Sequence, residues 1–230
     1  MANLTQLRML EELDGLLLVD KPEGIQFSTV VKTVKRKFNI VKVGHGGSLD
    51  TMASGLMALL INDANKFVDR IMSADREYVG TMKFGETTDT GDKFGRPVQS
   101  EGPFMPVSEA RGDVFQSEPR FCAVRRDGSA MYEVVDTGEH GNVLAHIYRF
   151  DLEGGAGAAE QGATVGFSLS ASRNLLPRAL AKDLGATLMS LRRTRIGRLS
   201  VEDAVPFDKL LEKDMKDFAP CVMPISSALQ

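Results

Sequence analysis

The chain has 230 residues, and 28 Lys and Arg against 31 Asp and Glu give it a formal net charge of −3. A hydrophobic share of 43% and a charged share of 26% are ordinary for a globular protein. Near-average contents of Gly (22) and Pro (9), without a persistent heptad run, exclude collagen, a coiled coil and wholesale disorder. The length predicts one domain, or one core with a small appendage, and the weak acidity leaves RNA binding open because one basic face suffices.

The first quarter of the chain predicts a strand, a helix and an apolar segment separated by turns. Residues 1–15 form an amphipathic lead-in, and the apolar run 16–19 ends at a turn with Pro and Gly, which is typical of a strand. Apolar residues at helical spacing predict a helix over 29–38. A glycine-rich loop covers 43–50, and residues 55–61 are again apolar.

The middle of the chain predicts strands joined by polar connections. Residues 65–73 have helical character, and alternation of apolar and polar residues predicts a strand over 78–84. Residues 85–95 form a polar loop rich in Thr, Asp and Gly, and a further strand is expected over 120–125.

The last third of the chain predicts two strands, a helix and a polar tail. Alternation predicts strands over 143–152 and 163–170, joined at a hairpin tip by the small-residue loop 154–162. Leucines spaced four residues apart predict a helix over 178–191, and short helical segments follow in the tail. Mixed strands and helices without an internal repeat indicate an α+β fold rather than a doubly wound one.

The cysteines and histidines limit which cellular compartment and which kinds of metal site can be expected. Cys122 and Cys221 lie far apart, and the three histidines stand in no metal-ligand spacing, so we expect neither a structural zinc site nor a disulfide framework. The N-terminal 15 residues carry acidic residues and no apolar core typical of a secretory signal. The longest apolar stretch, 55–61, is far below the roughly 20 residues that span a bilayer. We therefore expect a cytoplasmic protein that uses neither a membrane nor a metal.

The glycine-rich loop at 43–50 is the most unusual stretch of the sequence. Its three glycines allow close approach of the backbone to a ligand, but the Gly-Lys-Ser/Thr ending of a phosphate-binding Walker loop is missing. Asp50 either caps this loop or acts as a catalytic carboxylate, and capping is the commoner use of Asp in such a place. His45 is more often a hydrogen-bonding loop residue than a general base.

The Thr-Thr-Asp-Thr-Gly-Asp segment at 87–92 has two interpretations. A metal-binding loop is one, but the spacing and the closing Glu of an EF-hand are absent. A solvated turn is the other, and the residues alone favour it. Tyr78, at the start of an expected strand, is most simply a packing residue.

A cluster of arginines without an acid among them follows the expected leucine-rich helix. Its members are Arg192, Arg193, Arg195 and Arg198. A solvated face is the simpler interpretation. Contact with phosphate is the functional alternative, because a guanidinium matches the geometry of phosphate oxygens.

Taken in order, these pieces resemble the TruB family of tRNA pseudouridine synthases over nearly the whole chain. Residues 17–24 look like the opening motif of the family, and 42–56 like its catalytic-aspartate motif, which is the most specific match. Residues 76–95 resemble the next block, and 178–185 and 191–197 the late blocks.

The resemblance implies roles for five residues in the isomerisation of uridine. Asp50 would be the essential carboxylate that acts at the bond between ribose and uracil. Tyr78 would stack on the flipped-out base, because an aromatic platform offsets lost base stacking. Arg178 would pair with Asp50, and an opposite charge keeps a carboxylate ionised. Asp92 would help to hold Arg178 and Tyr78, and His45 would support the flipped-out RNA conformation.

The resemblance also places residues around the reacting base and departs from the family pattern there. Lys21 would shape the neighbouring strand turn. Leu176 stands where the family has a second pocket aromatic, and Pro177 fixes the backbone just before the arginine. Thr51 stands where the family usually has Pro. The reaction needs no cofactor.

The implied fold is a mixed, largely antiparallel sheet flanked by helices, with a thumb-like insertion near 120–145. We expect residues 1–205 to form the catalytic domain. Residues 206–230 would then be a short C-terminal tail rather than a full PUA-type RNA-binding domain.

The resemblance implies an enzyme that converts uridine 55 in the T-loop of tRNA to pseudouridine. Its partner would be the T-arm of tRNA, with Arg192, Arg193 and Arg195 contacting phosphates, and the protein would act as a monomer. Two alternatives stay open: an RNA-binding, tRNA-folding factor of the same fold with weak or no catalysis, and a synthase for a different RNA.

Overall fold

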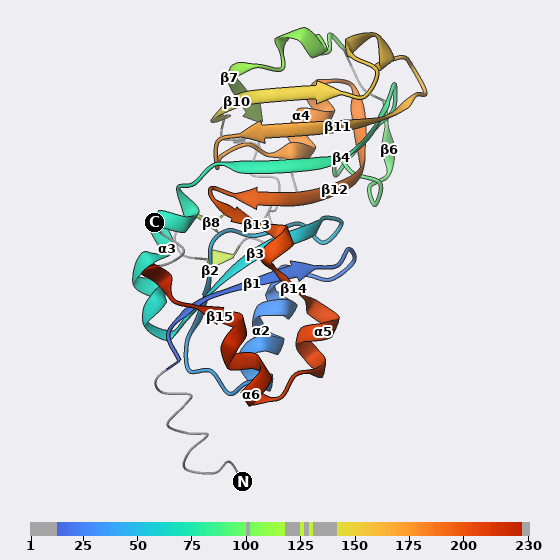
Figure 1. The fold of residues 1–230 in the computed structure, drawn as a ribbon. Coiled ribbons are helices and arrows are strands. Elements are labelled where there is room, and N and C mark those ends of the chain that lie inside the picture. The colour runs from blue at the N-terminus through green and yellow to red at the C-terminus, as the bar shows by residue number, and fades with distance from the viewer. Residues whose placement is uncertain (1–12, 100–101, 118–124, 127–128, 131–141, 227–230) are drawn as a thin grey trace. The chain divides into compact units, whose positions relative to one another are not determined.

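The computed structural model describes residues 13–99, 102–117, 125–126, 129–130 and 142–226, and the chain divides into two compact units (Figure 1). Unit 1 combines Met1–Ala74 with Arg193–Gln230, and unit 2 is Asp75–Arg192. The chain therefore leaves unit 1 after Ala74 and returns to it at Arg193, so segments from both ends of the sequence build one core.

The sheet of unit 1 is built around β1 (Gly15–Lys21). β1 pairs antiparallel with β3 (Ser54–Ile61). β2 (Val43–His45) also pairs antiparallel with β3, from Leu59 to Ile61. Two short strands from the C-terminal segment also join β1: β14 (Val205–Pro206) in parallel and β15 (Val222–Met223) antiparallel. β1 and β3 are buried along almost their whole length, as expected for strands covered on both faces.

Helices surround this sheet, and the predicted amphipathic helix is confirmed as α2 (Phe27–Lys37). Its buried residues are Val30 and Val34, and its last turn carries three basic residues, which suit the negative end of a helix. The other helical segments of unit 1 are η1 (Asn62–Phe67), α3 (Val68–Met72), η4 (Val201–Asp203), α5 (Phe207–Glu212), α6 (Met215–Phe218) and η5 (Ala219–Cys221).

The C-terminal segment contributes to the core of unit 1. Phe218 is fully buried, and its ring stacks on Phe38 with 3.7 Å between centroids and 14° between planes. Phe207 and Leu210 on α5 are also buried. The short helices near the C-terminus thus pack on α2 and β1 through apolar side chains.

Unit 2 is an antiparallel sheet with one helix against a face (Figure 1). Four strands, β4 (Arg76–Phe84), β11 (Thr164–Ala171), β10 (Asn142–Leu152) and β7 (Gly112–Ser117), pair antiparallel in that order. β12 (Ala186–Ile196) lies on the other side of β4, and its last residues pair with β13 (Leu199–Ser200) in unit 1. The remaining elements are β5 (Thr87–Thr88), β6 (Pro97–Val98), η2 (Val107–Glu109), β8 (Arg125–Arg126), β9 (Ser129–Ala130), η3 (Ala156–Ala158) and α4 (Pro177–Asp183).

The predicted helix over 178–191 is wrong beyond its first half. α4 ends at Asp183, and Gly185 then adopts a φ of +71°, the left-handed conformation in which glycine commonly ends a helix. From Ala186 the chain is the extended strand β12, where the Leu188 N–H donates to the carbonyl of Gly91 at 3.1 Å. The helical spacing of the leucines continues past Gly185, but the helix itself ends before this glycine.

The other predicted elements of the described residues are confirmed with shifts of a few residues, and the fold is α+β with a largely antiparallel sheet. The strand expected over 120–125, except for its last residue in β8, and most of the thumb-like insertion lie outside the described residues. Within the part of the chain that the structure describes, no helix is long and apolar enough to cross a membrane.

Candidate active site

Asp50 lies on the loop between β2 and β3 of unit 1. Its neighbour Leu49 is 6% exposed and Met52 is 1% exposed, so the side chains on both sides of it anchor the loop in the core. Asp50 itself is half-buried, and its carbonyl accepts a hydrogen bond from the Ala53 N–H at 3.1 Å. The packing of its neighbours therefore presents the carboxylate at a partly open position.

The glycines before Asp50 let this loop turn tightly against the sheet. Gly46 donates its N–H to the carbonyl of Ala58 on β3 at 2.8 Å, and a Cβ at this position would collide with Ile71. Gly47 has a φ of +123°, a conformation that glycine adopts at little cost. The glycine-rich pattern thus fits the backbone into the space between β3 and α3.

Lys21, at the end of β1, is bonded entirely to backbone carbonyls. Its side chain is fully buried, and Nζ donates to the carbonyls of Pro22 at 2.9 Å, Ile25 at 2.8 Å and Thr51 at 3.4 Å. Burial lowers the pKa of Lys21 to about 8, against the opposing effect of the Asp50 carboxylate. Lys21 therefore links the turn after β1 to the residue that follows Asp50.

Arg193 makes a second link to the same loop. It is 2% exposed, and its guanidinium donates to the carbonyls of Leu56 at 2.8 Å, Ser48 at 2.9 Å and Gly47 at 3.3 Å. These bonds hold the Arg193 guanidinium inside unit 1, and its expected role as a phosphate contact stays a prediction. Arg192 and Arg195 are half-exposed, and Arg195 donates to the carbonyl of Arg198 at 3.4 Å.

His45 is held at the end of β2. Its Nδ1 accepts a hydrogen bond from the Gly47 N–H at 3.3 Å, which places the proton of the neutral ring on Nε2. The edge of the ring meets Phe27 at the start of α2, with 5.0 Å between centroids and 67° between planes. Sequence reasoning did not select Phe27 as a site residue, because an aromatic at a helix start gives no separate signal.

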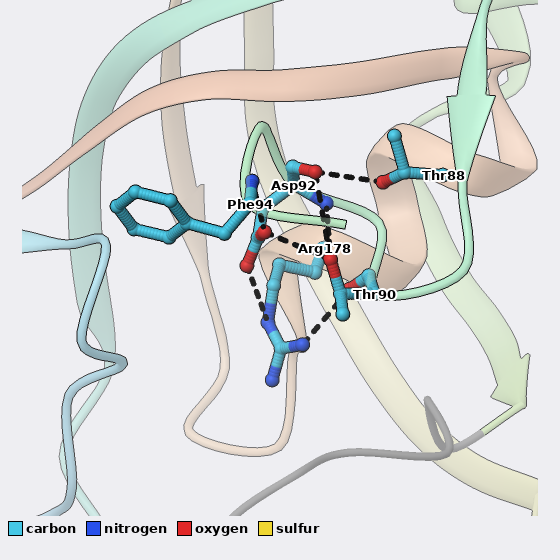
Figure 2. Close-up of polar contacts among 5 residues, drawn as sticks. All are labelled: Thr88, Thr90, Asp92, Phe94 and Arg178. Atoms are coloured by element: carbon cyan, nitrogen blue, oxygen red, sulfur yellow. Dashed lines mark hydrogen bonds and ion pairs between the residues drawn. The ribbon is translucent and has the colours of Figure 1, made fainter. Parts of the chain in front are cut away.

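A second cluster of polar residues lies in unit 2, where the 88–94 turn meets α4 (Figure 2). One Asp92 carboxylate oxygen accepts hydrogen bonds from the Thr90 hydroxyl at 2.8 Å and from the Phe94 N–H at 2.9 Å. The other lies 4.0 Å from Nε of Arg178, which also donates to the Thr90 carbonyl at 2.9 Å. The Thr88 hydroxyl donates to the carbonyl of Asp92 at 2.7 Å.

Burial of this cluster overturns the interpretation of 87–92 as a solvated turn. Thr88 is 3% exposed, and Asp92 and Arg178 are each 6% exposed. Gly91 has a φ of +77°, and a Cβ there would lie 2.9 Å from the Arg178 carbonyl oxygen. Figure 2 shows the Phe94 ring directed away from the ion pair, in keeping with its 60% exposure.

Tyr78 and Leu176 belong to the same unit. Tyr78 is 7% exposed and lies opposite Leu169 of β11 in the register of β4. Leu176 is half-buried, and its N–H and carbonyl both bond to the side chain of Gln116, at 2.9 and 3.2 Å. Gln116 is 1% exposed and was missed by sequence reasoning.

Pro177 is compatible with the helix that carries Arg178. It is the first residue of α4, a position where the N–H would have no partner within the helix and where the fixed φ of proline suits the helical turn. This departure from the family pattern therefore leaves Arg178 in the first turn of a regular helix.

Among the described residues, no group of three or more His, Cys, Asp and Glu side chains could hold a metal ion. The site consists of one half-buried carboxylate in unit 1, on a loop whose backbone is bonded to the buried side chains of Lys21 and Arg193, and one buried ion pair in unit 2.

Comparison with known proteins gives a family match and a fold match. A family model described as TruB family pseudouridylate synthase (N terminal domain) matches residues 35–154. A protein of Opitutus terrae named tRNA pseudouridine synthase B is 33% identical, with 95% of each chain covered. One of Gluconacetobacter diazotrophicus with the same name is 32% identical, over 94% of this chain and 76% of the relative.

Solved structures at lower identity share the fold. A Cbf5-Nop10-Gar1 complex contains a chain with a TM-score of 0.66 at 21% identity, covering 96% of this chain. An H/ACA RNP bound to a substrate RNA containing 2′-deoxyuridine gives a TM-score of 0.64 at 20% identity. This chain spans 63% and 62% of the length of those two chains.

Proposed function

Because the chain belongs to the TruB family of pseudouridylate synthases, we propose that it isomerises uridine to pseudouridine in tRNA. The observation that carries this proposal is the relative from Opitutus terrae, which is named tRNA pseudouridine synthase B and aligns over 95% of both chains at 33% identity. The loop that carries Asp50 and the buried pair of Asp92 and Arg178 lie in the segments that resemble the family motifs.

The reaction rearranges one bond of the nucleoside without net oxidation. The bond between N1 of uracil and C1′ of ribose breaks, the base rotates, and C5 bonds to C1′. A proton then leaves C5 and N1 carries a proton in the product, so the atoms balance without a cofactor. We assign Asp50 as the carboxylate that acts at C1′, because it is the half-buried acid of a loop with glycines and buried cations around it.

The buried cluster of unit 2 would supply the residues that hold the arginine and the extruded base. Arg178 and Asp92 form an ion pair, and Thr90 bonds to both of them. These contacts would hold the guanidinium in one orientation. Tyr78 would stack on the extruded uracil, since an aromatic ring compensates for the loss of base stacking. The pairing of Arg178 with Asp50 stays a prediction from the resemblance.

The substrate position and the cellular setting are also part of the proposal. We assign uridine 55 in the T-loop as the target, with the T-arm as the recognised element. A tRNA substrate is consistent with a cytoplasmic protein, and we expect it to act as a monomer. Arg192 and Arg195 are half-exposed and keep their proposed role as phosphate contacts.

The test uses an unmodified tRNA transcript with a T-arm, incubated with the purified protein. Pseudouridine is mapped by carbodiimide-dependent stops of primer extension, and binding is measured on the same transcript. A stop at the T-loop uridine supports the proposal. Binding without any stop would instead favour an RNA-binding, tRNA-folding factor, and a stop elsewhere would favour a synthase for a different RNA.

A further inference from the structure

Arg193 contacts the Asp50 loop on both sides of the carboxylate. Its guanidinium donates to carbonyls of Gly47 and Ser48, which precede Asp50, and of Leu56, which follows it on β3. Removal of this one side chain would take a hydrogen-bond donor from three carbonyls at once. Since the loop is a turn between two strands, its shape depends on such cross-links.

The backbone of Arg193 is also packed directly on the strand that follows the loop. Gly55 has a φ of +103°, and a Cβ at this position would collide with the Arg193 carbonyl oxygen. Neither the main chain nor the side chain of Arg193 therefore has room to move without moving β3. Gly55 lies five residues after Asp50, so a displacement of Arg193 would displace the chain close to the carboxylate.

The charge of Arg193 acts in the same neighbourhood as that of Asp50. Both residues influence Lys21, whose pKa the Arg193 charge lowers and the Asp50 charge raises. A guanidinium this deeply buried suffers from desolvation, which the three carbonyl dipoles offset.

We propose that Arg193 is a positioning residue for the isomerisation: it holds the Asp50 loop in its reactive shape through its bonds to the carbonyls of Gly47, Ser48 and Leu56. This inference rests on the proposed function. It removes Arg193 from the basic RNA-contacting cluster and gives it a role in the rate of the chemical step. Arginine suits the role because its planar fork reaches three carbonyls at once, which a lysine ammonium on a flexible stem does not reproduce.

The first experiment compares Arg193→Lys and Arg193→Met with the wild type on the tRNA transcript. Arg111→Lys is the control, because Arg111 is an exposed residue that pairs with Asp151 at 3.2 Å. The readouts are the fraction folded by circular dichroism, the Kd for the transcript, and the single-turnover rate at neutral pH.

We expect both variants to bind the transcript as the wild type does and to lose roughly 10- to 100-fold in single-turnover rate per folded molecule, as small misplacements of catalytic groups do. A rate loss explained by unfolding, or weaker binding with an unchanged rate, would overturn the proposal.

The second experiment does not need turnover and keeps the two proposals separate. In the ¹⁵N-labelled wild type, exchange of the Arg193 Nε–H proton with solvent is followed by NMR at neutral pH, with the Nε–H of the exposed Arg111 as the control. We expect the Arg193 proton, which donates to the Leu56 carbonyl at 2.8 Å, to exchange far more slowly than that of Arg111. An Arg193 proton that exchanges as fast as that of Arg111 would overturn the role of Arg193 even if the variants cannot be folded. A wild type without turnover would contradict the proposed function alone.

Discussion

The Arg178 guanidinium and the Asp92 carboxylate form an ion pair, 4.0 Å from Nε to Oδ2, in which each residue is only 6% exposed. Two hydrogen bonds from Thr90 and Phe94 complete the surroundings of the carboxylate. A buried pair of this kind contributes little net stability as a unit, but removing one partner leaves the other charge without compensation. The pair therefore holds the Arg178 guanidinium in one orientation.

Substitution of Asp92 tests whether the ion pair holds Arg178 in place. We expect Asp92→Ala to lower the free energy of unfolding by about 3 kcal/mol, because the buried Arg178 charge and two donors lose their acceptor. Asp92→Asn should lose less, since it keeps an acceptor for the Thr90 and Phe94 donors. Urea unfolding measures both. Asp151→Asn, in an exposed pair with Arg111, is the control and should change stability by less than about 0.5 kcal/mol. Equal effects at Asp92 and Asp151 would contradict the account.

Lys21 gives a pH-dependent prediction. Its pKa is about 8 in the folded protein and 10.5 without the fold, so between these values the unfolded chain binds the extra proton. The free energy of unfolding should then rise with pH in that window, by up to about 3 kcal/mol. The rise is measured as the difference between wild type and Lys21→Met in urea at pH 7.5, 9 and 10. A difference independent of pH would show that the folded pKa of Lys21 is not lowered.

Asp183 gives a prediction of the opposite sign. Burial raises its pKa from 3.8 to about 6, against the opposing charge of Lys182, and it is the last residue of α4, where the helix dipole disfavours a negative charge. The folded protein then binds the extra proton between pH 3.8 and 6, and stability is lost as pH rises through this window.

We expect Asp183→Asn to be more stable than the wild type at pH 7 by about 1–3 kcal/mol and to lose this advantage near pH 4. Thermal unfolding at the two pH values measures the effect. Asp69→Asn, an exposed carboxylate on α3, serves as the matched control. An advantage of the same size at both pH values would contradict the assigned cause.

The stacked pair of Phe38 and Phe218 predicts that the C-terminal segment is part of the folding unit. Phe218→Ala should cost about 3–5 kcal/mol, because a fully buried aromatic leaves a cavity. Leu211→Ala, at 36% exposure on α5, should cost far less. Urea unfolding of the whole chain decides between a structural role and a loosely attached tail, which would unfold without affecting the main transition.

Part of the fold could be predicted from local patterns. The buried runs of β1 and β3 and the amphipathic face of α2 follow directly from apolar spacing. The same rule failed at Leu188, because its spacing from Leu184 mimics a helix while Gly185 between them ends it. Backbone conformation at one glycine outweighed side-chain periodicity.

The site could be predicted only in part, and for a different physical reason. Asp50, Asp92 and Arg178 carry a family pattern, so their positions could be stated before their surroundings. The burial of Asp92 and the inward guanidinium of Arg193 depend on contacts made by residues distant in sequence, such as Gly47 with Arg193. A cluster of arginines looks alike in sequence whether its members meet water, phosphate or backbone carbonyls. Gln116, which satisfies both backbone groups of Leu176, gives no sequence signal at all.

The central claim is that Asp50 carries the isomerisation, and the most direct measurement compares Asp50→Asn with the wild type on one unmodified tRNA transcript. Single-turnover formation of pseudouridine and the Kd for the transcript are measured together, with Asp69→Asn as the matched carboxylate control. We expect no pseudouridine from Asp50→Asn, an unchanged Kd, and wild-type turnover in the control. Pseudouridine formation by Asp50→Asn at the wild-type rate would contradict it.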